Sequence, residues 1–351
     1  MGIIKEHNHT REMASIFDVS HMGNILIHGD LRNEFLERIT VAEVKELKKG
    51  HATLSLIMNK NGGIEDDCII TNMGDYISII VNGACKHKDW AYFLKTKETE
   101  FASAGDKIRL EFPDVNGLIA LQGPRAAEVL QNVVGTSLDL SKMDFMTSTV
   151  HNIKKINAEC MISRCGYTGE DGFEIAVLKE KAIDLGTILL NEKCGGSNQI
   201  VKMAGLGCRD TLRLECGMCL YGHELNDKIT PVESQLMWTI GKRRRAEGGY
   251  FGADVVNEKS KKGVPQRRCS FVSTGMAARE NVEIFDDKEK KVGVVTSGAY
   301  SPTLKCPIGM AYIDVPLHKD GNKLFAKNRG KTQQITIKKS PLVPTKYYKS
   351  K

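Results

Sequence analysis

The sequence predicts an α+β protein that ends in a small, separate β-domain. Strand-like and helix-like patterns are mixed over roughly the first 250 residues of the 351-residue chain. A Gly-Gly pair at 248–249 and a polar run at 257–263 then interrupt the pattern. Short strands separated by turns follow, which is typical of a small β-barrel or sandwich.

The first part of the chain is predicted to contain several strands and at least five helices. Apolar runs bounded by Gly, Asn and Asp predict strands at residues 24–28, 52–57, 68–71, 76–81, 107–112, 118–121, 150–153 and 158–164. The stretch between the second and third of these contains Asn-Gly-Gly at 61–63 and predicts a β-hairpin. Helices are expected at residues 31–39, 84–94, 179–190 and 207–215 and directly after Pro124, a residue favoured in the first helical turn.

The second part is predicted to be all β. Its strands are expected at residues 269–272, 282–285, 292–296, 308–313 and 334–337. We therefore expect one α+β region over residues 1–250 and a C-terminal β-domain over residues 262–351.

Composition indicates an ordinary globular protein with a mild excess of positive charge. The formal net charge is +7, and 41% of the residues are hydrophobic. No apolar stretch approaches the roughly 20 residues that cross a bilayer, so we expect no membrane partner. The densest basic cluster lies at 242–245, but no aromatic residues are interleaved with it, which argues against nucleic-acid binding. A solvated face or a dock for an anionic partner are the alternative interpretations.

The ten cysteines show no disulfide or zinc-finger spacing. Reduced, mostly buried thiols are the default interpretation. Cys216 and Cys219, followed by His223, could indicate metal or redox chemistry, but the residues between and around them look like packing residues. We expect no metal.

The most informative segment is the run 164–174, RCGYTGEDGFE, in which three glycines and an Asp precede a strand. Glycines allow backbone conformations and close approaches that other residues do not, so we predict a tight, shaped loop. Glu174 follows within the strand and shares a face with Ala176. A half-buried carboxylate there would need strong donors, and a ligand with adjacent N–H groups would supply them.

Taken together, an ordered series of motifs resembles the glycine cleavage aminomethyltransferase (T-protein) family over nearly the whole chain. Besides the 164–174 loop, the motifs are HTR at 9–11, FDVSHM at 17–22, TLSL at 53–56, GGIEDD at 62–67, ALQGP at 120–124, FMTS at 145–148, AGL at 204–206, RDTLRLE at 209–215, LYG at 220–222, PVE at 231–233, GKRRR at 241–245, GVVTSG at 293–298 and PTKYY at 344–348.

The resemblance implies a three-lobed fold, in which two intertwined α+β lobes bind folate and a C-terminal β-barrel follows. It implies transfer of a methylene unit from the aminomethylated lipoyl arm of H-protein to tetrahydrofolate, giving 5,10-methylenetetrahydrofolate, ammonia and dihydrolipoyl H-protein. Tetrahydrofolate is the implied co-substrate, H-protein the implied partner, and the mitochondrial matrix the implied location. Compared with the family pattern, we expect the N-terminal segment to be truncated, because Met1 stands close to the HTR motif.

The resemblance also assigns site residues. Asp67 matches the catalytic carboxylate, which would orient the pterin, accept a proton and stabilise a developing iminium cation. Glu174 matches the residue that pairs with the pterin ring, and Arg209 matches a folate-contacting arginine. Tyr347 matches a tyrosine that closes over the ligand. The matching wall positions are Met22, Leu54, Ile80 and Trp238.

Two other functions remain open at this level. One is a folate-linked demethylase of the same superfamily, although those enzymes carry a flavin-binding region and this chain has no Gly-x-Gly-x-x-Gly after a strand, so we expect no flavin. The other is a non-catalytic relative that binds folate or docks on H-protein.

Overall fold

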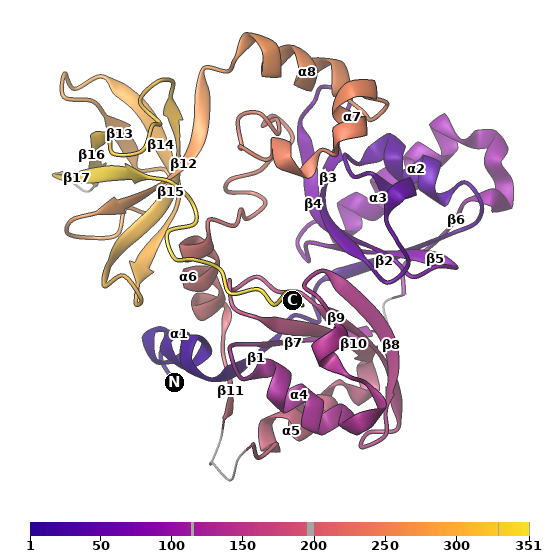
Figure 1. Ribbon diagram of the computed structural model, residues 1–351. Helices are drawn as coiled ribbons and strands as arrows, with labels where there is room; N and C mark the ends of the chain where they lie inside the picture. Colours follow the sequence, from indigo (N-terminus) through magenta and orange to yellow (C-terminus); the bar gives the residue numbers. More distant parts are fainter. Residues whose placement is uncertain (114–115, 195–199, 329, 351) are drawn as a thin grey trace.

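The computed structural model describes residues 1–113, 116–194, 200–328 and 330–350. Two β-sheets with their helices and a closed β-barrel surround the middle of the molecule (Figure 1). The barrel lies at the upper left of this view, the five-stranded sheet at the right, and the six-stranded sheet at the bottom. The predicted α+β class with a C-terminal barrel is confirmed.

One face of the five-stranded sheet is covered by helices, and the other face is turned toward the middle of the molecule. In sheet order its strands are β3 (Ala52–Met58), β4 (Ile64–Asn72), β5 (Tyr76–Val81), β2 (Gly23–His28) and β6 (Arg109–Glu111). Helices α2 (Arg32–Ile39) and α3 (Lys86–Glu100) contribute Phe35 and Phe93 to a core that also contains Ile70 and Ile79. Because strand side chains alternate, Ile69 and Ile80 point to the opposite face.

The six-stranded sheet has the same organisation. Its order is β11 (Val201–Met203), β1 (Ala14–Asp18), β7 (Asn116–Gln122), β10 (Gly172–Leu178), β9 (Ala158–Arg164) and β8 (Thr147–Ile153). Helices α4 (Ala126–Val134) and α5 (Ala182–Asn191) cover the face that carries Phe173 and Ile175. The opposite face of β10 carries Glu174 and Ala176, as the alternation predicts.

The two sheets are joined at their edges. His51 forms an isolated antiparallel bridge with Thr147, the amide of Ala52 donates to the Met146 carbonyl at 2.8 Å, and the amide of Ser148 donates to the Gly50 carbonyl at 2.7 Å. These backbone bonds join the edge strand β3 of the five-stranded sheet to the edge strand β8 of the six-stranded sheet. The helix-free faces of the two sheets are therefore fixed relative to each other.

The barrel closes without leaving a sheet edge unpaired. Its strand order is β12 (Gln266–Ser273), β15 (Cys306–Asp314), β14 (Lys291–Ser301), β13 (Glu283–Phe285), β16 (Lys323–Asn328) and β17 (Lys331–Lys338), with β17 pairing back to β12. Closure removes the exposed edges that favour unwanted strand pairing. Strand β16 was not among the five strands expected from the sequence, because its short apolar pattern is broken by lysines.

Three of the four remaining helices were not predicted. They are α1 (Ile3–Glu12), α7 (Lys242–Glu247) and α8 (Ala253–Lys262), whereas α6 (Leu206–Cys216) matches the expected helix at 207–215. Helix α8 occupies most of the polar run interpreted as an interruption. It buries only Ala253 and Val256, one helical turn apart, so its apolar periodicity is too weak to stand out.

Short 3-10 turns complete the described secondary structure at η1 (Val44–Glu46), η2 (Ala102–Lys107), η3 (Gly135–Ser137), η4 (Leu140–Lys142), η5 (Lys179–Lys181) and η6 (Met237–Thr239).

The C-terminal tail does not stay with the barrel. After Lys338 the chain runs past α6 and ends near the middle of the molecule, beside the six-stranded sheet (Figure 1). The amides of Leu342 and Val343 donate to the Glu215 carbonyl at 2.8 and 3.0 Å, and the Lys346 amide donates to the Gly169 carbonyl at 2.8 Å. The last residues therefore contact the glycine-rich loop of the first region.

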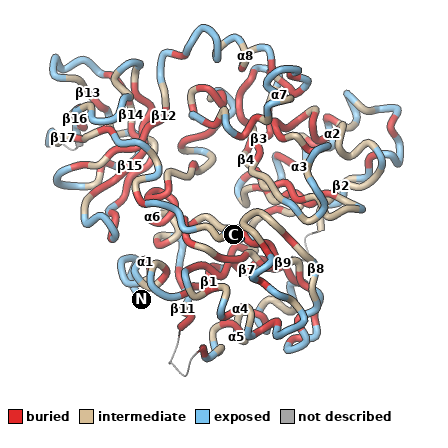
Figure 2. Tube along the Cα trace, viewed as in Figure 1, coloured by how far each residue is buried: buried red, intermediate tan, exposed pale blue. Residues whose placement is uncertain are grey.

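Buried residues form separate cores in the barrel and in the two sheet lobes, while segments between the lobes include intermediate and exposed residues (Figure 2). The domain boundaries at 250 and 262 remain a prediction.

Candidate active site

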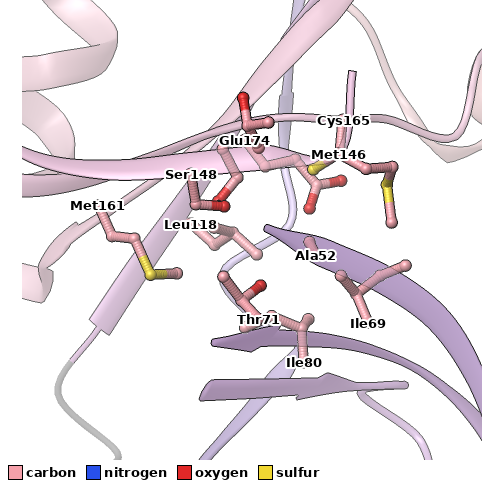
Figure 3. A pocket seen from close by; sticks show the side chains of 12 residues that line it. Ala52, Ile69, Thr71, Ile80, Leu118, Met146, Ser148, Met161, Cys165 and Glu174 are labelled. Atoms are coloured by element: carbon pink, nitrogen blue, oxygen red, sulfur yellow. The ribbon is translucent and has the colours of Figure 1, made fainter. Parts of the chain in front are cut away.

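A pocket lies between the helix-free faces of the two sheets and encloses about 360 Å³ of space outside the atoms, including space open to solvent. One wall comes from the five-stranded sheet and the other from the six-stranded sheet and its flanking loops (Figure 3). The lining side chains belong to Ala52, Ile69, Thr71, Ile80, Leu118, Met146, Thr147, Ser148, Met161, Ser163, Cys165 and Glu174. The wall is mainly apolar with a few polar groups, which is typical of a small-molecule site.

Glu174 is the one carboxylate among these lining residues. It stands opposite Ser163 in the β10–β9 register, and the Ser163 hydroxyl is engaged by the Ser148 hydroxyl at 2.8 Å. The Cys165 thiol lies near this carboxylate, since burial and then the Glu174 charge raise the pKa of Cys165. A thiol is a weak donor. The Glu174 carboxylate is therefore available to stronger N–H donors of a ligand.

The loop that leads to Glu174 is held closed at its base, as the glycine pattern predicts. The Arg164 guanidinium bonds the Asp171 carboxylate at 3.0 and 2.6 Å through two nitrogens. A Cβ on Gly166 would come within 1.9 Å of Gln122 Oε1, so only glycine fits there. The Gln122 amide in turn donates to the Cys165 carbonyl at 2.9 Å. This loop is a rigid support for the pocket wall.

Arg209, on α6, has an unused donor in this structure. Its guanidinium lies 4.6 Å from the centre of the Tyr167 ring, and its buried Nη1 atom has no hydrogen-bond partner among the described residues. The electrostatic influence of both Arg209 and Glu174 on Cys165 indicates that all three groups lie in one neighbourhood. A ligand carbonyl or carboxylate would satisfy the free donor.

Asp67 lies on β4, on the same face as the pocket-lining Ile69 and Thr71. Its carboxylate accepts a hydrogen bond from Asn82 Nδ2 at 2.9 Å. Burial, followed by the neighbouring Asp66 carboxylate, raises the pKa of Asp67 to about 7. A group with this pKa can both hold and release a proton near neutral pH.

The predicted wall residues do not all reach this pocket. Ile80 lines it directly. Met22 is half-buried and packs with Ile80 in one apolar cluster, and Leu54 pairs with the pocket residue Ile69 across β3 and β4. Trp238, in contrast, lies in η6 with 64% of its surface exposed, and it is not among the pocket-lining residues.

Tyr347 reaches the first region through the C-terminal tail. Its ring stacks on Phe145, with ring centres 3.9 Å apart and planes 10° apart. Burial raises its pKa, and among the groups that influence it is Cys165 at the pocket wall. The tail is fixed on both sides of this tyrosine, by Lys346 on Glu170 at 3.1 Å and by the Tyr348 carbonyl, which accepts from the Phe145 amide at 2.9 Å.

The basic run at 242–245, for which a solvated face and an anion dock were the alternative interpretations, is used for contacts within the protein. Arg243 forms ion pairs with Glu37 at 2.6 Å and with Glu46 at 2.8 Å, and Arg244 is buried with its guanidinium on the Glu37 carbonyl. This basic cluster therefore joins α7 to α2 and leaves less charge for a docking partner.

Cys216 donates to the Thr168 carbonyl at 3.2 Å, whereas His223 contacts the Thr296 carbonyl at 3.3 Å. Within the described residues no group of three or more His, Cys, Asp or Glu side chains could hold a metal ion, and no helix is long and apolar enough to cross a bilayer.

Sequence reasoning missed a buried ionic cluster that fixes the glycine-rich loop. Glu215, fully buried on α6, accepts from Arg11 at 2.6 Å and lies 3.2 Å from His7. Arg11 also bonds Glu170 at 3.0 Å and the Thr168 carbonyl at 2.8 Å. Apart from His7, these residues lie in the HTR, RDTLRLE and RCGYTGEDGFE motifs, but only the fold shows that the motifs meet.

The sequence also gave no sign of the roles of Asn82 and Asp89, which surround the Asp66–Asp67 pair. Asn82 directly follows β5, and Asp89 lies on α3. Neither stands in a motif with a recognisable spacing, because their partners are on other elements.

Comparisons with known proteins match the whole architecture. The GCVT N-terminal domain model matches residues 1–244, and the glycine cleavage T-protein C-terminal barrel domain model matches residues 266–344. The chain is 43% identical to the mitochondrial aminomethyltransferase of Dictyostelium discoideum over 99% of this chain and 86% of that protein. It is 42% identical to the mitochondrial aminomethyltransferase of Homo sapiens, over 97% of this chain and 82% of that protein.

A solved structure agrees with these sequence relationships. The crystal structure of glycine cleavage system aminomethyltransferase T from Bartonella henselae superimposes with a TM-score of 0.89 at 32% identity, covering 99% of this chain and 91% of that chain. This match confirms the expected three-lobed fold. The chain belongs to the glycine cleavage T-protein family.

Proposed function

We propose that this chain is an aminomethyltransferase that moves a methylene unit from the aminomethylated lipoyl arm of H-protein to tetrahydrofolate. The observation that carries the proposal is that each of the two facing sheets carries one carboxyl group on its pocket-facing side. Glu174 enters the pocket from one sheet beside the Cys165 thiol. Asp67 is not among the lining residues but lies on the pocket-facing side of the other sheet, and burial and then Asp66 raise its pKa to about 7.

In this proposal Glu174 binds the pterin ring. Its carboxylate accepts from a ring N–H and from the adjacent exocyclic amine, in the side-by-side geometry that carboxylates form with guanidinium groups. Arg209 then receives a carbonyl or carboxylate of the folate on its free Nη1. Ile80, Leu54 and Met22 supply the apolar wall.

Asp67 performs the proton chemistry. Nitrogen N5 of the pterin attacks the methylene carbon, and ammonia leaves with the N5 proton as the C–N bond breaks. The lipoyl thiolate then leaves as the C–S bond breaks, which produces an iminium cation at N5. N10 bonds to the same carbon and releases its proton, which Asp67 passes to the thiolate. A carboxyl group with a pKa near neutrality takes up that proton at little cost, and its ionised form stabilises the iminium cation that forms between the two steps. The products are 5,10-methylenetetrahydrofolate, ammonia and dihydrolipoyl H-protein.

Tyr347 and the exposed Trp238 are proposed as further folate contacts. Tyr347 comes from a tail that is already fixed beside the pocket loop. Trp238 would act on a part of the folate outside the pocket, because 64% of its surface is open. Lipoylated H-protein is the proposed partner, and the mitochondrial matrix the proposed location, since similar proteins are named as mitochondrial.

The test is ammonia release and 5,10-methylenetetrahydrofolate formation from aminomethylated H-protein, with purified wild-type protein and Asp67→Ala. General acid–base groups contribute roughly 10²–10⁴-fold, so the variant should be slower by at least 10² with little change in folate affinity. Equal rates would remove the proposed role of Asp67. A folded wild-type chain that binds folate without turnover would instead favour the non-catalytic folate-binding relative.

Glu174→Gln separates binding from chemistry. The amide keeps the shape but loses the charge and one acceptor, so folate affinity should fall by roughly tenfold or more. A dissociation constant unchanged from the wild type would place the pterin elsewhere.

A further inference from the structure

Asp89 is a buried acid whose surroundings do not suit an ordinary carboxylate. It lies on α3 and is fully buried. Its Oδ1 atom accepts from Lys88 Nζ at 2.9 Å. Its Oδ2 atom is also buried but meets no donor among the described residues. A buried carboxylate oxygen without a donor is costly, so this atom needs an explanation.

The explanation lies in the neighbouring Asp66. This residue is fully buried as well, and after burial its carboxylate is the group that most raises the pKa of Asp89, so the two carboxyl groups lie close together. Two ionised carboxylates have only acceptors, so such a contact requires a proton on one of them. Sharing one proton also removes the repulsion that two buried like charges would otherwise feel.

The hydrogen bonds indicate which of the two residues keeps the proton. Asp66 accepts from Asn82 on both oxygens, from Nδ2 at 2.8 Å and from the backbone amide at 3.0 Å. These donors stabilise an Asp66 anion. Burial and the Asp66 charge raise the pKa of Asp89 to about 8, so Asp89 retains the proton at neutral pH.

Asn82 connects this buried pair to the proposed active site. The same Nδ2 group that donates to Asp66 Oδ1 donates to Asp67 Oδ1 at 2.9 Å. An amide nitrogen has two hydrogens, and here each is used on one carboxylate. Asp66 lies on the helix-covered side of β4 and Asp67 on the pocket side. The orientation of Asp67 therefore depends on where Asp66 holds the Asn82 side-chain amide.

We propose that Asp89 is a positioning residue for the methylene transfer: its buried carboxyl group donates a hydrogen bond to Asp66, which holds the Asn82 amide in the orientation that Asp67 requires. The proposal rests on the proposed function, because it uses Asp67 as the group that handles the proton. Asp89 itself does not touch the substrate.

The groups around Asp89 allow a clear test of its protonation. The titratable side chains near it or its direct partners are Asp66, Asp67, Glu65, Cys68, Cys85, Lys88 and Tyr221. Lys88 is the cationic partner in this set, and 42% of its side chain is exposed. If Asp89 were ionised, Lys88 would be the group that stabilises it.

The experiment compares Asp89→Asn with Asp89→Ala in the full chain. The Asn amide keeps a donor for Asp66 and an acceptor for Lys88, as a protonated carboxyl does, whereas Ala keeps neither. Glu98→Gln, an exposed residue of the same helix, is the control for loss of one negative charge. Thermal unfolding from about pH 6 to about pH 9, infrared difference spectra at neutral pH and the pH dependence of kcat are measured for all four proteins.

We expect the wild type to show the carbonyl band of a protonated carboxyl group at neutral pH and Asp89→Asn to lack it. Because a raised pKa makes the native state lose stability as pH rises through it, Asp89→Asn should gain stability over the wild type toward about pH 9. Asp89→Asn should retain a higher kcat than Asp89→Ala, whose kcat should fall by about tenfold. Only the two proteins that keep Asp89, the wild type and Glu98→Gln, should show an alkaline decline of kcat from this residue.

Two results would overturn the proposal. The first is a wild-type spectrum with no band that Asp89→Asn removes, together with lower stability of this variant at every pH, because both indicate an ionised Asp89 paired with Lys88. The second is equal kcat in Asp89→Ala and wild type. Failure of the proposed function is distinguishable, since the wild type would then show no turnover, or Asp67→Ala would keep the wild-type rate, while the spectra and the stability still report on Asp89.

Discussion

The Glu215→Gln substitution should test how the buried ionic cluster holds the glycine-rich loop and the tail together. The Glu215 carboxylate accepts hydrogen bonds from Arg11, Ser301 and Thr303 at 2.6, 2.5 and 2.9 Å. These donors and the nearby His7 outweigh burial, and they lower the pKa of Glu215 from 4.5 to about 2. Such a difference corresponds to ~3 kcal/mol of stability from this one ionised group.

Replacing the carboxylate by an amide removes the charge but little volume. We expect the free energy of unfolding at pH 7 to fall by ~3 kcal/mol, near the lower end of values for breaking a buried pair, because Arg11 keeps its bond to Glu170. Urea titrations followed by tryptophan fluorescence measure this change. Glu258→Gln, which removes only a surface pair with Lys262, should produce no measurable change.

The pH dependence gives a second, independent readout. A lowered pKa means that the stabilisation is fully present above the unfolded value of about 4.5 and is lost as pH falls toward 2. The difference between wild type and Glu215→Gln should therefore be constant from pH 7 to about 5 and shrink below that. Equal stability at pH 7, or a difference that stays constant down to about pH 3, would refute the reasoning.

Three further predictions follow from other contacts. Asp67→Asn should abolish transfer yet raise the free energy of unfolding at about pH 8 by up to ~4 kcal/mol. The reason is that the wild type loses stability as pH rises from the unfolded pKa of 3.8 through the raised folded pKa of about 7. If Asp67 were an ordinary surface acid, urea titrations at about pH 5 and pH 8 would show the same difference between variant and wild type. Gly169→Ala should cost roughly 2–4 kcal/mol, since its φ is +76° and a Cβ would lie 2.0 Å from Cys216 Sγ; a variant as stable as wild type would mean that the loop can shift. Tyr347→Ala should weaken tetrahydrofolate binding while leaving the two sheets folded, because its ring stacks on Phe145 beside the tail and belongs to neither sheet. Unchanged affinity in isothermal titration would exclude it as a folate contact.

Much of the local structure was predictable because it depends on neighbours in the chain. The hairpin around Asn61-Gly62-Gly63, the helix after Pro124 and the placement of Glu174 beside Ala176 on one face of β10 all follow from turn chemistry and strand alternation. The ordered motifs also predicted the family, and that prediction is confirmed by the matching family models.

Other elements could not be predicted because their stability comes from tertiary contacts. Helix α1 carries three polar or charged residues, His7, Thr10 and Arg11, that look solvated in the sequence but are wholly or largely buried against other lobes. The basic run at 242–245 left a solvated face or a dock for an anionic partner as alternatives, yet in helix α7 Arg243 and Arg244 are used within the protein on Glu37. Charge in a sequence does not reveal whether its partner is solvent or another lobe.

The sequence by itself determined the fold class, the family and a set of candidate residues whose roles in folate binding remain predictions. Only the tertiary structure decided which of these residues meet. It brought Glu174 and Ile80 to one pocket between two sheets, linked Asp67 through Asn82 to a buried carboxyl pair, and left Trp238 exposed. The physical reason is that strand pattern and glycine spacing act within a few residues, whereas a buried charge is stabilised by donors that the fold brings from distant parts of the chain.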